Sequence, residues 1–161
     1  MSNPGRYVVT AFICLFLLIG CSDQNIKNVI YFGIAQSPQN LDPRFQSDAA
    51  SERISELIYS PLFYFDKNYK TQSNIVNWEK VNPLKYKFII KKKLPTFHHN
   101  KIMSVGDIVA TLNSLRSKKK SPFYIELNNI KIITKLSESS FEINLFKKDI
   151  NFISRLAFFI L

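Results

Sequence analysis

The chain has 161 residues, of which 46% are hydrophobic and 14% aromatic. This length and composition suit about one globular domain, and they exclude a repeat solenoid or a disordered tail. The net charge of +10 invites a nucleic-acid partner, but the lysines are spread over predicted strands and turns and arginine is scarce, so a solvated lysine-rich surface is the simpler explanation.

The first 20 residues predict an export signal. One arginine precedes the uncharged apolar run Tyr7–Leu18, which is shorter than the roughly 20 residues of a membrane-spanning helix. Leu18-Ile19-Gly20-Cys21 then resembles the lipobox of bacterial lipoproteins. This resemblance implies cleavage before Cys21 and a diacylglyceryl group on its thiol, with a plain signal peptide or short anchor as the alternative. Residues 21–28 would form a polar tether.

The first elements after the tether alternate in type. Val29–Ile34 is apolar on both faces and predicts a strand buried on both sides. Gln36–Asn40 predicts a loop. A helix is expected over Ser47–Tyr59, with Ser47 or Asp48 as its cap. Its expected buried face consists of Ala50, Ile54, Leu57 and Ile58, and its solvent face of Glu52, Arg53 and Glu56.

The remaining elements continue this pattern. Strands are predicted at Leu62–Phe65 and Lys85–Lys91, the second of them with alternating apolar and lysine residues. Ser104 and Asp107 predict a capping box at the start of a helix. That helix should bury Ile108, Val109, Leu112 and Leu115. Two more strands are expected at Ile130–Ile133 and Phe141–Leu145, before a final apolar segment, Ile150–Leu161. In the second of these strands, apolar Phe141, Ile143 and Leu145 alternate with polar Glu142 and Asn144.

Several motifs occur in a particular order along these elements. They are Leu41-Asp42-Pro43, Ile58-Tyr59-Ser60-Pro61-Leu62, Trp78, Tyr86-Lys87-Phe88, Phe97-His98-His99-Asn100 and Ser104–Val109. In this order they resemble the family-5 extracytoplasmic solute-binding proteins, the peptide- and nickel-binding components of ABC importers. His99-Asn100 replace the family's Asp-Gly, although an Asn can hold the left-handed turn that a Gly usually makes. Lys91 replaces the family's Arg.

The resemblance implies an α/β fold like the type II periplasmic binding proteins. Residues 29–161 would form an incomplete first lobe, with a mixed sheet and flanking helices. The implied function is the substrate-binding component of an ABC importer for oligopeptides or dipeptides, in the periplasm or cell envelope and attached by the lipid on Cys21. Its partners would be a peptide or other small solute and the permease subunits, with no cofactor and no nucleic acid. The apolar end at Phe158–Leu161 leads us to expect a truncated or split-gene product.

In family members, the loop after the first strand lends backbone to the ligand. The resemblance therefore implies a ligand-binding role for Gln36, Ser37, Pro38 and Gln39, with a plain strand-to-helix turn as the alternative. We expect Asp107 to be a helix cap, and Phe97 and Trp78 to be core residues.

Neither metal nor enzymatic chemistry is expected. Adjacent histidines in extended chain, such as His98-His99, point to opposite faces and have no third ligand nearby, so no metal site is expected. Both cysteines, Cys14 and Cys21, lie near the start, which leaves no zinc-finger spacing in the rest of the chain. There is no phosphate loop or nucleophile elbow, so the chain is not expected to be an enzyme. The alternative function is a small basic envelope lipoprotein that binds anionic surfaces or a protein partner, and a second alternative is an exported nucleic-acid binder.

Overall fold

The computed structural model describes residues 29–91, 94–157 and 159–160, in two compact units that divide after Gly33. In the first unit, the described residues 29–33 form no strand, and Ile30 and Tyr31 are 92% and 89% exposed. The prediction of a buried strand at Val29–Ile34 is therefore wrong. An apolar segment forms a buried strand only where neighbouring strands complete its hydrogen bonds, and no described strand pairs with this one. The predicted signal, tether and Cys21 lie outside the described residues.

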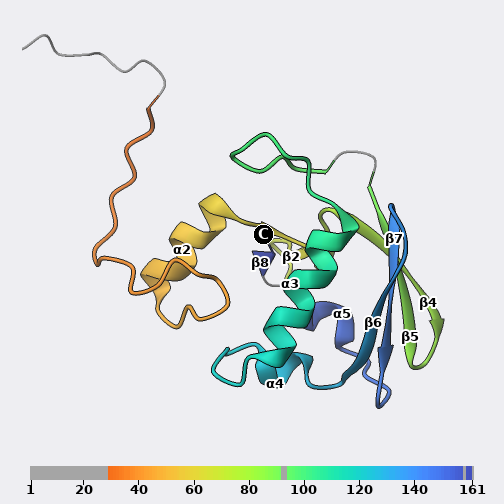
Figure 1. Cartoon of the computed structure of the whole chain (residues 1–161). Coiled ribbons are helices and arrows are strands. Elements are labelled where there is room, and N and C mark those ends of the chain that lie inside the picture. The colour runs from red at the N-terminus through yellow and green to blue at the C-terminus, as the bar shows by residue number, and fades with distance from the viewer. Residues whose placement is uncertain (1–28, 92–93, 158, 161) are drawn as a thin grey trace, which may run out of the picture. The chain divides into compact units, whose positions relative to one another are not determined.

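The centre of the second unit is a four-stranded sheet whose neighbouring strands are all antiparallel. Its strands, in spatial order, are β4 (Val76–Asn82), β5 (Lys85–Ile90), β7 (Ser140–Leu145) and β6 (Ile130–Ser137). Helix α3 (Val105–Ser117) runs along one face of this sheet, as Figure 1 shows. The expected α/β class with flanking helices is confirmed.

The core lies between α3 and the sheet. Phe88 of β5 stacks on Phe141 of β7, with ring centroids 4.8 Å apart. Ile108 and Leu112 of α3 are fully buried. This confirms the predicted alternation of β5 and β7 and the predicted buried face of α3, of which only Val109 is half-buried. Trp78 was expected in the core but is 42% exposed, because it lies on the edge strand β4.

The start of α3 has the predicted capping box. The Ser104 hydroxyl accepts from the Asp107 backbone N–H at 3.2 Å, and the Asp107 carboxylate accepts from the Ser104 N–H at 2.9 Å. In the preceding turn, Asn100 has a φ of 63°, the left-handed conformation expected at this position. Phe97 in the same turn packs against the core. These local predictions are confirmed.

Helix α2 (Ala49–Ile58) begins at the predicted cap, Asp48, but packs through a different face from the predicted one. Its buried residues are Ser51 and Ser55, whereas Leu57 is 66% exposed and Ile58 is 42% exposed. The reason is the loop before the helix. This loop is held to the serine face by a hydrogen bond from the Asn40 N–H to Ser51 Oγ and one from Ser55 Oγ to Gln46.

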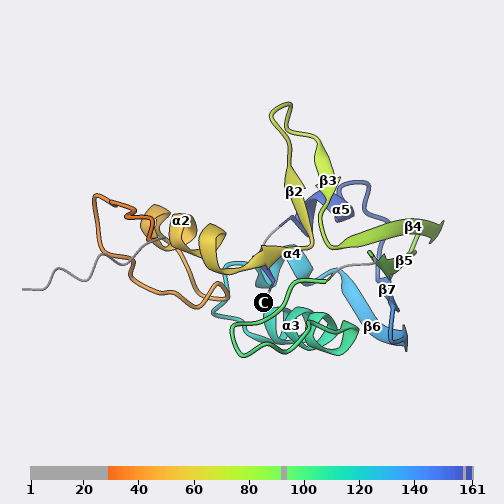
Figure 2. The same cartoon turned by 90° about the horizontal axis from the view of Figure 1, so that it is seen from above.

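The smaller elements surround this core. β2 (Phe63–Phe65) and β3 (Thr71–Ser73) form an antiparallel hairpin that stands out from the four-stranded sheet in Figure 2. The remaining elements are β1 (Ser60–Pro61), which pairs with β8 (Phe159–Ile160), and the one-turn helices α4 (Tyr124–Leu127) and α5 (Phe152–Arg155). None of the described helices is long and apolar enough to span a bilayer.

Candidate ligand-binding site

Two adjoining hollows lie beside α2, with volumes of about 270 and 380 Å³. Gln46, Glu52 and Phe123 line both. The first hollow is also lined by Ser47, Asp48, Ala49 and Pro122, and the second by Glu56, Pro61, Phe63, Tyr64, Phe65 and Ala157. We call these two hollows the α2 cleft. The larger hollow falls within the range of about 300–1,000 Å³ that is usual for ligand pockets, and the smaller lies just below it.

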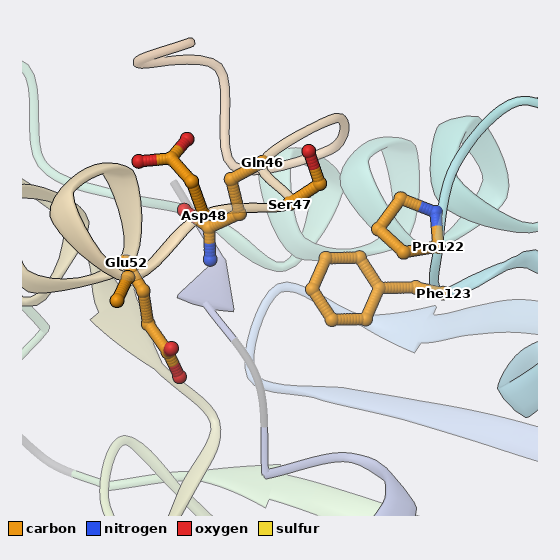
Figure 3. A pocket seen from close by; sticks show the side chains of 7 residues that line it. Gln46, Ser47, Asp48, Glu52, Pro122 and Phe123 are labelled. Carbon is orange, nitrogen blue, oxygen red and sulfur yellow. The ribbon is translucent and has the colours of Figure 1, made fainter. Parts of the chain in front are cut away.

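Three elements position the side chains of the α2 cleft. Glu52 and Glu56 lie one helical turn apart on the same side of α2. Tyr64 and Phe65 come from β2, and they are 47% and 50% exposed. Phe123 precedes α4, and Figure 3 shows its ring pointing toward the loop that leads into α2, with Glu52 on the other side of the opening. The cleft therefore has an acidic wall and an aromatic wall.

Gln46 adds a polar donor to the cleft. This side chain is only 8% exposed, and its carbonyl oxygen accepts from Ser55 Oγ at 2.6 Å. Its amide nitrogen has no acceptor among the described residues. Since no described side-chain polar atom is both fully buried and unpaired, that nitrogen is open to solvent. It can donate a hydrogen bond to a ligand.

The carboxylates of Glu52 and Glu56 have no hydrogen-bond or ion-pair partner among the described residues, in contrast to the other described acids. Seven of those acids pair with Lys or Arg: Asp42, Glu79, Asp107, Glu126, Glu138, Glu142 and Asp149. Asp48 and Asp66 accept backbone N–H groups instead. Glu52 and Glu56 are thus the two described carboxylates without a hydrogen-bond or ion-pair partner among the described residues, and both line the α2 cleft.

The structure places the predicted ligand loop next to the start of α2. Gln36 lines a third hollow, of about 330 Å³, which is also lined by Ile34, Ala35, Ala49, Ala50 and Arg53. Hydrogen bonds from the Ser51 hydroxyl and backbone N–H hold the pKa of the Asp48 carboxyl below its usual value, with a smaller contribution from the Gln39 backbone. Ser37 and Pro38 line none of the three hollows. The ligand-binding role of this loop stays a prediction.

The sequence placed Glu52 and Glu56 on a solvent face, and both are exposed, but it did not predict that they line the α2 cleft. One signal was available: neither glutamate has a Lys or Arg four residues away on the helix, where a solvated acidic face would usually pair. No local pattern indicates that Phe123 lies opposite them. His98 and His99 are both exposed, and no group of three metal-ligating side chains occurs among the residues that the structure describes.

Comparison with protein-family models and with curated proteins finds no match. Solved structures do match. NikZ from Campylobacter jejuni, in complex with Ni(L-His), is 22% identical with a TM-score of 0.68, over 78% of this chain and 26% of that one. The oligopeptide-binding protein AppA from Bacillus subtilis is 25% identical with a TM-score of 0.66, over 74% and 24%. The ABC transporter substrate-binding protein CtaP from Listeria monocytogenes is 22% identical with a TM-score of 0.65, over 80% and 27%.

The chain thus spans about a quarter of the length of the structures it matches. Those structures are of binding proteins, not enzymes. The match confirms, at the level of the fold, the resemblance that the motifs indicated: the described chain has the fold of part of a family-5 extracytoplasmic solute-binding protein.

Proposed function

We propose that the chain supplies part of the substrate-binding component of an ABC importer and that its solute is an oligopeptide or dipeptide. The observation that carries this proposal is the match of about three quarters of the chain to AppA and CtaP, which their descriptions name as an oligopeptide-binding protein and an ABC transporter substrate-binding protein. The permease subunits of such an importer would be its protein partners.

The α2 cleft is the proposed contact with the peptide. β2 contributes Phe63, Tyr64 and Phe65 to this cleft and pairs with only one described strand, β3. An extended peptide can bind beside such a strand through main-chain hydrogen bonds, while side chains enter neighbouring pockets. Backbone groups of Gln36–Gln39 would add a second contact to the same solute.

The peptide assignment can be tested with the full chain in a mild detergent. Isotope-labelled protein is titrated with a pool of dipeptides to pentapeptides, and NMR shift changes are followed at the α2 cleft. Binding should be weak but localised, because the chain spans only about a quarter of the matched proteins. If no peptide shifts any resonance at millimolar concentration while anionic vesicles do, the alternative function of a basic envelope lipoprotein is favoured.

We also propose that Cys21 carries a lipid that holds the protein to the membrane outside the cytosol. The support is the lipobox-like Leu18–Cys21 segment after an apolar run. When the chain is expressed in a bacterium, Cys21→Ser should move the protein from the membrane fraction to the soluble fraction. Mass spectrometry should show that the variant lacks the diacylglyceryl group carried by the wild type. Cys14→Ser is the matched control and should change neither. Equal membrane attachment of Cys21→Ser and wild type would contradict the anchor.

A further inference from the structure

We propose that the α2 cleft selects peptides with a positively charged side chain and binds its guanidinium or ammonium group between Glu52, Glu56 and the aromatic wall. This inference rests on the proposed function as a peptide-binding part of a solute-binding protein. It names the class of peptide, which the comparisons leave open.

The first support is the distribution of charge. The chain has 22 Lys+Arg and only 12 Asp+Glu, so an acid has many possible partners. Every other described carboxylate forms an ion pair with Lys or Arg or accepts a backbone N–H group. Glu52 and Glu56 have neither kind of partner among the described residues. Two like charges one turn apart repel each other, and a cation bound between them removes that repulsion.

The second support is the aromatic wall. Tyr64 and Phe65 are half-exposed and line the larger hollow, with their rings on opposite faces of β2, and Phe123 lines both hollows. The faces of aromatic rings attract cations, and a guanidinium group stacks well on them. A side chain with an apolar stem and a charged end fits this combination, because the stem contacts the rings while the end reaches the carboxylates.

The third support is Gln46, which distinguishes a peptide from a bare metal ion. Its side chain is about nine-tenths buried, and its unpaired amide nitrogen is a hydrogen-bond donor. A donor does not coordinate a cation, but it can bind the carbonyl oxygen of a peptide whose basic side chain lies at the glutamates. The cleft therefore offers carboxylates for the charged end of a basic side chain and an amide donor for the backbone carbonyl of the same peptide.

The experiment compares three pentapeptides with blocked ends, identical except for Arg, Ala or Glu at the centre. Each is titrated into the full chain in mild detergent, and the dissociation constants are measured by NMR. The Arg peptide should bind about tenfold more tightly than the Ala peptide, and the Glu peptide most weakly, as expected for a charge-assisted pair. The double variant Glu52→Gln, Glu56→Gln should bring the Arg and Ala peptides to the same affinity.

The matched control is Glu138→Gln, because Glu138 is an exposed acid in the turn between β6 and β7, outside the cleft. It should leave the preference for Arg unchanged. A second variant, Glu56→Lys, should reverse the preference toward the Glu peptide, and circular dichroism should show that both cleft variants keep the fold. Equal binding of all three peptides to the wild type overturns this inference and leaves the proposed function standing. Absence of binding by these peptides and by the mixed pool overturns the proposed function itself.

Discussion

At the residue scale, Asp107 links local structure to pH. The hydrogen bond from the Ser104 hydroxyl, together with Lys101 at 3.1 Å, holds the pKa of Asp107 below its ordinary 3.8. A carboxyl with a lowered pKa in the folded state stabilises that state when ionised. Its contribution is therefore fully present above about pH 4 and is lost as the pH falls through the lowered pKa.

The first prediction concerns this pH dependence. Asp107→Asn should lower the free energy of unfolding at neutral pH, and the difference from wild type should shrink between about pH 4 and pH 2, because the wild-type carboxyl becomes protonated there. Urea unfolding at a series of pH values measures it. Glu138→Gln serves as the control, since that side chain is 86% exposed. A difference that stays constant with pH would mean that the ionised carboxylate contributes nothing.

The second prediction concerns the left-handed turn at Asn100, where φ is 63°. Asn100→Ala should lower the free energy of unfolding by about 1 kcal/mol, because a Cβ without a polar group is strained in this conformation. Asn100→Gly should be close to neutral, since glycine adopts the same conformation without strain. Denaturant midpoints compare the two variants. Equal midpoints for them would show that the turn does not depend on this conformation.

At the element scale, α2 shows how a helix can begin where the sequence predicts and still pack on an unexpected side. Its apolar positions at helical spacing predicted a buried stripe, but a loop bonded to Ser51 and Ser55 occupies the other side. Side-chain hydrogen bonds with the preceding loop therefore decided the orientation. That orientation also places Glu52 and Glu56 at the cleft.

The third prediction tests this orientation. Leu57→Gln should change the free energy of unfolding by no more than about 0.5 kcal/mol, because Leu57 is mostly exposed. Leu112→Ala, at a fully buried position of α3, should cost about 2–5 kcal/mol. Both are measured by urea unfolding. If Leu57→Gln lowered the free energy of unfolding as much as Leu112→Ala, the result would support the orientation of α2 that the sequence predicted.

At the scale of the whole molecule, many large apolar side chains are exposed despite the high net charge. Large apolar side chains that are at least 40% exposed include Ile30, Tyr31, Phe32, Leu41, Leu57, Ile58, Tyr64 and Phe65. Soluble monomers rarely expose large contiguous apolar patches, and such patches usually mark interaction surfaces. The chain matches only 26% of NikZ and 24% of AppA, so much of their fold has no counterpart in this chain.

The fourth prediction follows from this exposure. In aqueous buffer without detergent, the Cys21→Ser chain should self-associate as its concentration rises, because association buries these side chains. The double variant Leu57→Gln, Ile58→Gln should weaken that association, whereas Lys147→Gln should not. Sedimentation velocity over a range of concentrations measures it. A chain that stays monomeric throughout would contradict the prediction.

Elements whose signals are local were predicted well. The capping box of α3 depends on residues three apart, and the alternation of β5 and β7 depends on a period of two, so each can be read from a short window. β3 and β4 were missed, because β3 is only three residues long and polar and β4 is exposed along most of its length. The strand at Val29–Ile34 was predicted wrongly, since an apolar run does not reveal whether neighbouring strands are present.

The sequence by itself determined the starts of α2 and α3, the left-handed turn at Asn100, the inward faces of the central strands and the order of motifs that indicated the fold. Each of these depends on neighbouring residues or on a short period. Only the tertiary structure decided which side of α2 is buried and that Glu52 and Glu56 line the same hollow as Phe123, some 70 residues further along the chain. Contacts at such separations depend on how loops close and elements pack, and no window of sequence contains that information.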